Sequence, residues 1–278
     1  MKVLLFGTGG VPHGTPKRSS LAGIKQIREL GLDCMELAFV RRVAMGEKTA
    51  SEVRQAAEEY EVRLSVHAPY YVNLNSTEAD KVQASRKRIL QAARVGWLCG
   101  AQSIVFHPAF YHGDPPEIVY ERVRRHLVEL VEELRAEGNG TTLRPETTGK
   151  GSQFGTLEEL LMLSKEVEGV APCVDFAHLH ARTGADNAYE EFVAFLELIE
   201  GELGQAGLGD MHIHMSGIDY GPGGEKEHLN LADADLRYIE LLQALRDFEV
   251  GGLVICESPN LEEDALLMQK TYRGLAKH

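Results

Sequence analysis

The sequence predicts a closed (β/α)8 barrel, and three observations lead to this fold class. Short apolar runs alternate with longer amphipathic segments from one end of the chain to the other, a pattern that is typical of repeated βα units. Eight segments of each kind can be counted, which is the number that closes a parallel barrel. The length of 278 residues suits a single barrel, so we expect one domain over residues 1–278. A doubly wound open sheet is the alternative.

The predicted elements follow one another in regular alternation. The strands are Lys2–Gly7, Cys34–Ala38, Arg63–His67, Ser103–His107, Thr141–Glu146, Ala171–Asp175, Met211–Met215 and Gly252–Glu257. The helices have apolar residues at i, i+3 and i+4. They cover residues 19–30, 48–60, 77–99, 115–137, 156–168, 187–203, 232–248 and 261–276. Thr156 and Glu159 predict a capping box, and Gly31 and Gly100 stand where helices are expected to end.

The composition is that of a globular and acidic protein. Hydrophobic residues make up 44% of the chain and charged residues 26%, with a formal net charge of −13. This charge argues against general electrostatic attraction to nucleic acid or to an anionic membrane surface. If the chain handles a polyanion, it must do so through a local site, for which bound metal cations can supply the positive charge.

The cysteines and apolar segments indicate a reducing compartment. Cys34, Cys99, Cys173 and Cys256 show no CxxC spacing, and we expect buried free thiols. The apolar run at the N-terminus is too short for a signal peptide, and no stretch approaches the roughly 20 apolar residues of a membrane span. We therefore expect a cytoplasmic monomer that does not contact membranes.

Histidine, aspartate or glutamate stands at the end of six successive predicted strands. The segments are Ser65-Val66-His67, Val105-Phe106-His107, Pro145-Glu146-Thr147, Val174-Asp175-Phe176-Ala177-His178, His212-Ile213-His214 and Cys256-Glu257-Ser258. In a parallel barrel the carboxyl ends of the strands carry the functional residues. A single histidine there is more often a hydrogen-bonded core residue, but a buried ring of imidazoles and carboxylates carries a desolvation cost that pairing offsets only in part. We therefore predict bound divalent metal.

The donor types narrow the choice of metal. Imidazole and carboxylate without thiolate suit zinc, manganese or iron, and the large share of histidine favours zinc or manganese. One cation takes three or four protein ligands, so this ring has room for two or three ions.

The ordered motifs resemble those of a known family. Ser65-Val66-His67-Ala68-Pro69-Tyr70, Phe106-His107-Pro108, Pro145-Glu146-Thr147-Thr148-Gly149, Asp175 with His178, His212 through Ser216 and Glu257-Ser258-Pro259 resemble, in order, the motifs of the endonuclease IV family. This is AP endonuclease family 2, with a barrel of the xylose-isomerase type. The resemblance spans roughly residues 60 to 260. It implies a zinc-dependent DNA-repair hydrolase that cleaves the phosphodiester 5′ to an abasic site and leaves a 3′-hydroxyl.

The resemblance also implies a ligand set. His67 and His107 would hold one metal, and Glu146 would bridge it to a second, which Asp175, His212 and Glu257 would complete; His178 and His228 would serve a third. Glu146 and Glu257 would be the catalytic carboxylates around a metal-bridging hydroxide that attacks phosphorus.

The chain departs from the family pattern near the third metal. The family has an Asp-x-His pair there, but the stretch Gly224-Glu225-Lys226-Glu227-His228 puts Lys226 in the place of the aspartate. Either Glu225 or Glu227 substitutes for it, or the third metal is weak or missing and the Lys226 ammonium supplies the positive charge.

Two further assignments stay open. His212 and His214 point to the same face of a strand, so either of them could be the ligand. Glu36, in the second predicted strand, could face the barrel mouth and hydrogen-bond a ligand histidine, or could turn to the surface.

DNA contacts are predicted at two places around the barrel mouth. Tyr70 and Tyr71 stand where the family has residues that enter the duplex and help to expose the abasic nucleotide, and Arg41 and Arg42 could contact phosphates. An ordinary solvated loop and a packed aromatic pair are the alternatives.

Two other functions compete with abasic-site cleavage. A sugar isomerase or epimerase on the same barrel would need only one metal, held by Glu146, Asp175, His212 and Glu257, with a small sugar as its substrate. A nucleic-acid-binding protein that has lost turnover is the third possibility, and Lys226 is its main support.

Overall fold

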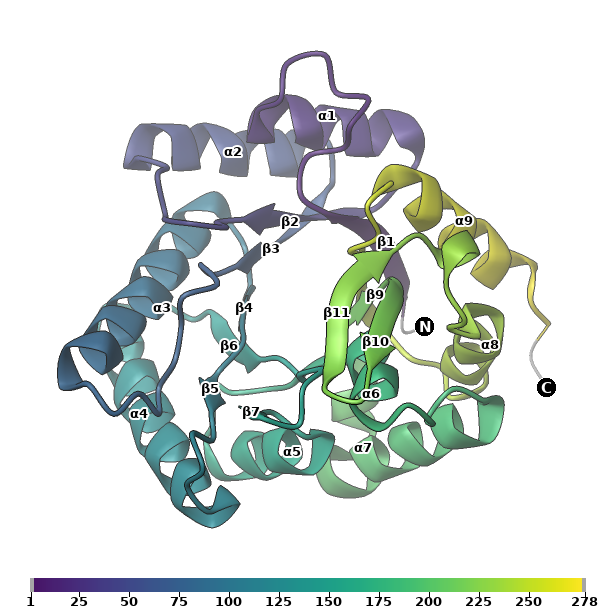
Figure 1. Ribbon diagram of the computed structural model, residues 1–278. Coiled ribbons are helices and arrows are strands. Elements are labelled where there is room, and N and C mark those ends of the chain that lie inside the picture. Colours follow the sequence, from purple (N-terminus) through teal and green to yellow (C-terminus); the bar gives the residue numbers. More distant parts are fainter. Residues whose placement is uncertain (1–2, 277–278) are drawn as a thin grey trace.

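Eight parallel strands form a closed barrel at the centre of the molecule (Figure 1). The computed structural model describes residues 3–276. The barrel strands are β1 (Leu4–Gly9), β2 (Cys34–Ala38), β3 (Arg63–His67), β4 (Ser103–Phe106), β6 (Thr142–Pro145), β8 (Cys173–Asp175), β9 (Met211–Met215) and β12 (Gly252–Cys256). β1 pairs with β12, and the bridges Leu143–Val170 and Glu146–Cys173 join β6 to the segment of β8. The predicted barrel is therefore confirmed, and the open sheet is excluded.

Helices surround the barrel and cover the outer faces of its strands (Figure 1). They are α1 (Ser20–Leu30), α2 (Glu47–Glu59), α3 (Ala79–Cys99), α4 (Pro116–Ala136), α5 (Leu157–Glu166), α6 (Phe176–Thr183), α7 (Tyr189–Gly209), α8 (Tyr238–Asp247) and α9 (Glu262–Gly274). The sequence did not predict α6, which follows β8 directly. The first strand begins two residues later than predicted, and Lys2 lies outside the described residues.

Local signals in the sequence explain where individual helices begin and end. Thr156 Oγ1 accepts a hydrogen bond from the Glu159 amide at 3.2 Å, and Glu159 Oε2 accepts one from the Thr156 amide at 2.9 Å. This is the predicted capping box. Gly31 and Gly100 end α1 and α3 at φ 77° and 81°, left-handed angles that glycine adopts at little cost.

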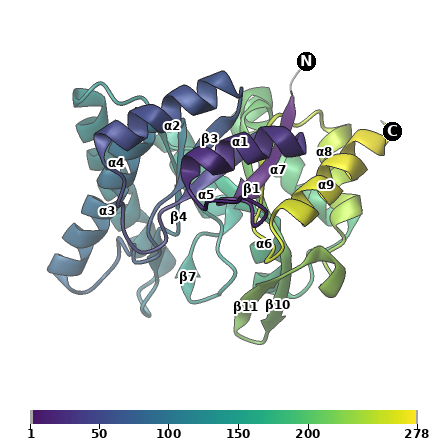
Figure 2. The same cartoon turned by 90° about the horizontal axis from the view of Figure 1, so that it is seen from above.

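Two short antiparallel ribbons stand at the carboxyl ends of the barrel strands. One pairs β5 (Ala109–Phe110) with β7 (Gln153–Phe154), and the other pairs β10 (Gly217–Gly221) with β11 (Gly224–Leu229). In Figure 2, β7, β10 and β11 extend beyond the same end of the barrel. A 3-10 turn, η1 (Leu231–Asp233), follows the second ribbon. The ribbons build up the wall around the predicted site.

All four cysteines are buried and free, as the sequence predicted. Among the described residues, no helix is long and apolar enough to cross a membrane.

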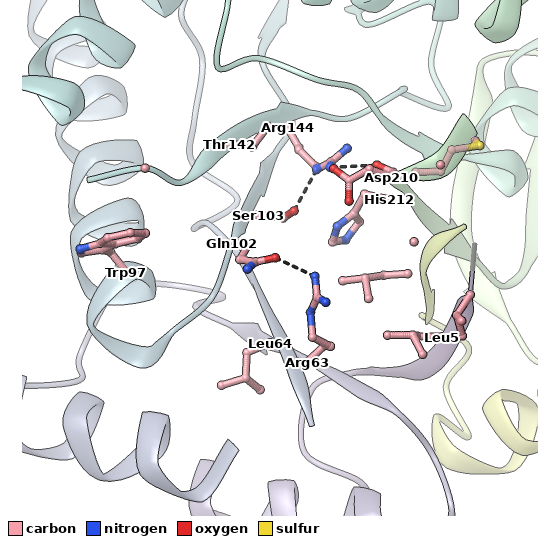
Figure 3. A pocket seen from close by; sticks show the side chains of 16 residues that line it. Leu5, Arg63, Leu64, Trp97, Gln102, Ser103, Thr142, Arg144, Asp210 and His212 are labelled. Atoms are coloured by element: carbon pink, nitrogen blue, oxygen red, sulfur yellow. Dashed lines mark hydrogen bonds and ion pairs between the residues drawn. The ribbon is translucent and has the colours of Figure 1, made fainter. Parts of the chain in front are cut away.

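A cavity of about 450 Å³ opens at the amino ends of the strands, opposite the ribbons (Figure 3). The Arg144 side chain lies in its wall, 3% exposed, and is held by three partners. Its guanidinium donates to Ser103 Oγ at 2.9 Å, to the Pro172 carbonyl oxygen at 3.1 Å and to Asp210 Oδ2 at 2.7 Å. In barrels of this kind, residues at this end contribute to stability, and the saturated hydrogen bonds of Arg144 agree with that role.

Gly252 offers a test of the barrel closure. It begins β12 at φ +121°, and an added Cβ would lie 2.0 Å from the Met211 carbonyl oxygen. Because backbone rather than a flexible side chain blocks the space, we expect Gly252→Ala to lower the free energy of unfolding by about 3 kcal/mol, measured by urea denaturation.

Gly201 is the matched control for this substitution. It lies within α7, and an added Cβ would meet nothing within 4 Å. Gly201→Ala should stabilise the protein by roughly 0.5–1 kcal/mol. Equal effects of the two substitutions would contradict the proposed cause.

Candidate metal centre

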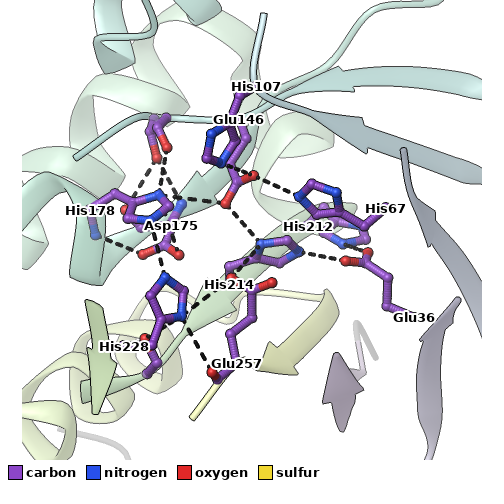
Figure 4. Close-up of polar contacts among 12 residues, drawn as sticks. Glu36, His67, His107, Glu146, Asp175, His178, His212, His214, His228 and Glu257 are labelled. Atoms are coloured by element: carbon purple, nitrogen blue, oxygen red, sulfur yellow. Dashed lines mark hydrogen bonds and ion pairs between the residues drawn. The ribbon is translucent and has the colours of Figure 1, made fainter. Parts of the chain in front are cut away.

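The barrel brings most of the predicted site residues together at the carboxyl ends of the strands (Figure 4). Seven of the eight lie at the ends of six barrel strands or just after them, because parallel strands in a closed sheet all direct these ends toward one opening. The eighth, His228, comes from β11 of the antiparallel ribbon. The residues are His67, His107, Glu146, Asp175, His178, His214, His228 and Glu257. Residues far apart in the sequence thus form one cluster.

The first group of possible ligands consists of His67, His107 and Glu146, whose ligand atoms all lie within 4.8 Å of one another. The Nε2 atoms of His67 and His107 lie 3.3 Å and 3.0 Å from Glu146 Oε2. The backbone amide of Glu146 donates to the Phe106 carbonyl oxygen at 3.0 Å, so the barrel sheet fixes the position of this carboxylate.

The second group consists of Glu146, Asp175, His214 and Glu257, again within 4.8 Å. His214 Nδ1 lies 2.9 Å from Glu146 Oε1 and 3.3 Å from Glu257 Oε2. Asp175 Oδ2 is buried and has no hydrogen-bond partner among the described residues. Glu146 belongs to both groups and directs one oxygen toward each of them.

The third group consists of Asp175, His178 and His228. The Nε2 atoms of the two histidines lie 3.4 Å apart, and His178 Nδ1 lies 2.9 Å from the Thr147 carbonyl oxygen. That carbonyl accepts a hydrogen bond from Nδ1–H and leaves Nε2 to face the cluster. Thr147 is a residue that the sequence did not single out for this role.

The donor set fits divalent metal ions. Imidazole nitrogens and carboxylate oxygens converge in these three overlapping groups, and a fourth group of Cys173, His212 and His214 adds a buried thiol. Such mixed donors suit zinc and similar divalent ions. Asp175 Oδ2 supports this, because it is buried without a hydrogen bond among the described residues and has only the His178 imidazole at 3.6 Å to offset that cost.

The charges of the cluster shift its ionisation strongly. Burial opposes ionisation of Glu146, yet the neighbouring charges of His107 and His214 hold its pKa well below the usual value. Burial likewise opposes ionisation of Glu257, but the charge and hydrogen bond of His214 lower its pKa to about 2. Burial raises the pKa of Asp175. Of the three carboxylates, Glu146 and Glu257 therefore stay ionised, the form in which a carboxylate binds a cation.

His67 and His178 shift in the opposite direction. Burial alone would lower the pKa of His67, but the hydrogen bond and charge of Glu146 raise it to about 9. Burial also opposes protonation of His178, and the charges of Asp175 and Glu146 raise its pKa to about 9. Burial also opposes protonation of His214, but the neighbouring charges raise its pKa well above the usual value. Without a cation, His67, His178 and His214 carry positive charge that the carboxylates require.

The structure separates His212 from His214, the two histidines between which the sequence left the choice of ligand open. His214, not His212, lies with Glu146, Asp175 and Glu257. The strand register explains this, because β9 pairs His214 with Asp175 and His212 with Cys173, one pleat deeper in the barrel. His212 Nε2 lies 3.0 Å from Glu36 Oε2, and the His212 side chain is 1% exposed. Glu36 itself faces the barrel interior and not the surface, which is the first of the two orientations expected for it.

The structure places Lys226 outside the cluster. The ribbon shifts register so that Asp219 pairs with Glu227 and Tyr220 with Glu225, which leaves Lys226 as the extra residue of a β-bulge. Its ammonium lies 3.2 Å from Asp219 Oδ2, and the side chain is 57% exposed. The side chain does not supply a positive charge inside the cluster.

Glu225 takes the inward position next to the bulge. Its Oε2 lies 3.7 Å from His178 Nε2, and its side chain is 16% exposed, whereas Glu227 is exposed. The Glu225 amide donates to the Gly149 carbonyl oxygen at 2.9 Å. An added Cβ on Gly149 would lie 2.6 Å from the Glu225 Cβ, so the contact requires glycine at this position. The glycine in Thr147-Thr148-Gly149 is therefore the feature of the sequence that points to this contact.

The residues expected to contact DNA lie outside the cluster. Tyr70 and Tyr71 are 59% and 63% exposed, and the Tyr70 ring packs edge-on to His67 with centroids 5.5 Å apart. Arg88 donates to the Tyr71 carbonyl oxygen at 3.0 Å. Arg41 and Arg42 are exposed in the loop after β2.

The raised histidine pKa values predict the pH dependence of the metal-free protein. Protonation of His67 and His178 stabilises the fold fully below their ordinary pKa of 6.5, and this contribution is lost as the pH rises through about 9. We expect the free energy of unfolding in the presence of a chelator to fall between pH 6.5 and 9, by at most about 1.4 kcal/mol per pH unit for each histidine.

Urea denaturation across this range measures the effect. His67→Gln should make the slope shallower, and the exposed His112→Gln is the control. Zinc should weaken or reverse the slope, because cations displace these protons. A metal-free protein that becomes more stable toward pH 9 would contradict the argument.

Comparison with known proteins agrees with this geometry. The sequence model described as a xylose isomerase-like TIM barrel matches residues 24–277. An uncharacterized protein of Methanocaldococcus jannaschii is 42% identical over 274 residues, which cover 98% of each chain. A probable endonuclease 4 of Symbiobacterium thermophilum is 30% identical over 224 residues, which cover 78% of each chain.

Two solved structures share the fold with the same TM-score of 0.71. One is a D-tagatose 3-epimerase-like protein, 20% identical, covering 98% of this chain and 96% of that one. The other is endonuclease IV from Thermus thermophilus, 19% identical, covering 98% of each chain. Identities this low establish the fold alone. The match of the family model over residues 24–277 places the chain in the xylose isomerase-like TIM barrel family.

Proposed function

We propose that this protein is a metal-dependent endodeoxyribonuclease that hydrolyses the phosphodiester 5′ to abasic sites in DNA. One observation carries the proposal: three ligand groups overlap, with Glu146 shared by two of them and Asp175 shared by two. Such an arrangement suits a multinuclear site, and two neighbouring cations are the recurrent device of phosphodiester hydrolysis. The endonuclease 4 relative at 30% identity supports the same activity.

Each group of residues has a role in this proposal. His67, His107 and Glu146 would hold one ion, and Glu146, Asp175, His214 and Glu257 a second. When bound, the ions supply Lewis acidity and activate water. Glu146 and Glu257, which are ionised because His214 lies against both, would hold the ions in place and balance part of their charge. Zinc fits these donors best, with manganese as the alternative.

The DNA substrate would be held at the rim of the barrel mouth. The chain has a net charge of −13, so cations in the cluster would provide the main attraction for a phosphate. Tyr70 and Tyr71 present exposed rings next to His67, where they could stack in the space left by a missing base. Arg41 and Arg42 would contact backbone phosphates.

The third ion is where this chain differs from the resembled pattern. His178 and His228 supply two nitrogen ligands. Glu225 would replace the missing aspartate, because its carboxylate faces His178 and Lys226 is turned away toward Asp219. The third site would then be formed by residues of both the barrel and the β10–β11 ribbon.

A single-metal sugar epimerase is the second candidate. The observation that favours it is the group Glu146, Asp175, His214 and Glu257, which is by itself a sufficient site for one ion with three carboxylates and one imidazole. The epimerase-like structure with the same barrel is consistent with it. This candidate leaves the His67–His107 and His178–His228 pairs without a function, which is why we rank it second.

Incision of an abasic duplex tests the main proposal. Purified protein loaded with zinc or manganese should cut a duplex that carries one abasic site and leave a 3′ end that a DNA polymerase extends. Glu146→Gln should reduce the rate by roughly 10²–10³-fold, since it removes the shared anionic ligand. The product is resolved on a denaturing gel.

Glu61→Gln is the control for this substitution, because Glu61 is exposed and pairs only with a surface arginine, Arg28. Its activity should equal that of the unchanged protein. No incision with either metal, combined with one tightly bound ion per chain and epimerisation of a ketose, would replace the main proposal with the second.

The role of Glu225 predicts a change in metal content. Glu225→Gln should lose one bound zinc per chain or bind it much more weakly, as measured by elemental analysis after dialysis at low free zinc. Lys226→Ala is the matched control, because its ammonium pairs with Asp219 instead. If Lys226→Ala changed the zinc content and Glu225→Gln did not, the assignment would be wrong.

A further inference from the structure

Arg182 is a half-buried side chain of α6 that binds the backbone of a single loop. Its Nη1 atom donates to the Lys150 carbonyl oxygen at 2.6 Å and lies 3.1 Å and 3.2 Å from Oγ1 and the carbonyl oxygen of Thr148. Its Nη2 atom donates to the Gln153 carbonyl oxygen at 3.1 Å. One guanidinium therefore joins the two ends and the middle of the loop that residues 148–153 form.

This loop contacts the β10–β11 ribbon through Gly149. The Gly149 carbonyl oxygen accepts a hydrogen bond from the Glu225 amide at 2.9 Å. An added Cβ on Gly224, whose φ is +91°, would lie 2.2 Å from the same oxygen. Because the loop and the ribbon approach so closely here, the position of the loop determines the position of the Glu225 backbone.

The helix that carries Arg182 also carries His178. The two residues are four positions apart, so their side chains leave α6 on the same face. His178 Nδ1 lies 2.9 Å from the carbonyl oxygen of Thr147, directly before the loop, and His178 Nε2 lies 3.7 Å from Glu225 Oε2. In Figures 1 and 2, α6 lies next to the ribbon. This helix therefore holds both a histidine of the third ligand group and the loop that supports Glu225.

We propose that Arg182 is a positioning residue for the third ligand group. By holding residues 148–153, it fixes the Gly149 carbonyl oxygen, which in turn holds the Glu225 backbone so that the Glu225 carboxylate faces His178. The inference rests on the metal centre of the proposed function and extends it to a residue outside the ligand groups.

The shape of the guanidinium explains why arginine suits this position. Arginine presents its N–H donors in a planar fork, whereas lysine ends in a single ammonium on a flexible stem. The acceptors belong to three different residues of the loop, so a fork reaches them together and one ammonium does not. Arg182→Ala removes all of these contacts, and Arg182→Lys should restore them only in part.

Amide hydrogen exchange in the metal-free protein provides the first measurement. The Glu225 amide is protected by its hydrogen bond to Gly149. Because Arg182→Ala releases the loop that carries the acceptor, we expect it to speed this exchange about 10-fold, as measured by nuclear magnetic resonance on 15N-labelled protein. Arg182→Lys should give an intermediate rate.

Arg135→Ala is the matched control for this measurement. Arg135 also donates to a backbone carbonyl oxygen, that of Glu168 at 3.0 Å, but it lies in the last turn of α4. Its substitution should leave the exchange rate of the Glu225 amide unchanged.

Urea denaturation shows whether each variant folds. If Arg182→Ala does not fold, Arg182→Lys carries the test, because it keeps the positive charge and loses only the fork. An unchanged exchange rate of the Glu225 amide in the folded variant, whichever of the two it is, would overturn the proposal.

Zinc affinity separates the positioning of Glu225 from a general loss of structure. The protein is stripped of metal, and zinc is titrated in competition with a chromophoric chelator. We expect Arg182→Ala to weaken the most loosely bound zinc ion about 10–100-fold and to leave tighter ions unchanged. In the Glu225→Gln background it should have no further effect, because Arg182 acts through Glu225. Equal weakening of all ions, or an effect that adds to that of Glu225→Gln, would overturn the proposal.

The exchange of the Glu225 amide requires neither metal nor DNA, so the two proposals can fail separately. If abasic DNA is not cut but this exchange is faster in Arg182→Ala, the proposed function fails and the role of Arg182 remains. If DNA is cut and neither the exchange nor the zinc affinity changes, only the role of Arg182 fails. If Glu225→Gln itself leaves the zinc content unchanged, the third ion fails, and amide exchange alone decides the role of Arg182.

Discussion

The burial of one carboxylate, Glu146, is the constraint on which the cluster depends. An isolated anion at the centre of a barrel is strongly disfavoured, so its neighbours must compensate for its charge. His67 and His107 approach one oxygen and His214 the other, at 2.9–3.3 Å. These residues come from β3, β4 and β9 and can meet only because the sheet closes. The fold and the cluster are therefore a single arrangement, in which barrel closure brings the cationic partners to the anion.

The sequence predicted the fold and most of the cluster because parallel strands leave little choice about which end bears function. His67, His107, Glu146 and Asp175 each end a strand or follow it directly, and they meet as expected. The sequence could not choose between His212 and His214 because a period of two puts both on the same face, and only the pairing with β8 reveals the depth of each. Such a register depends on tertiary contacts that no local pattern contains.

The inward turn of Glu225 could not be predicted for a related reason. The motif position that should hold an acid has Lys226, but a one-residue bulge in the ribbon moves the lysine outward and places the preceding residue next to His178. A bulge changes the face of the ribbon toward which the nearby side chains point. Alignment with the motif therefore could not predict which side chain faces the cluster. Gly149 makes room for Glu225. The sequence contains this glycine but does not show which residue packs against it, so its role could not be predicted.

The β10–β11 ribbon differs from the rest of the centre in how it is attached. It belongs to neither the barrel sheet nor the ring of helices, and Tyr220 ties it to Asp235, which also meets His180. It nevertheless supplies His228 and Glu225. Substitutions in the β10–β11 ribbon can therefore change the residues next to the third ligand group while the barrel strands keep their packing. One barrel can in this way evolve different reactions without a change in its interior.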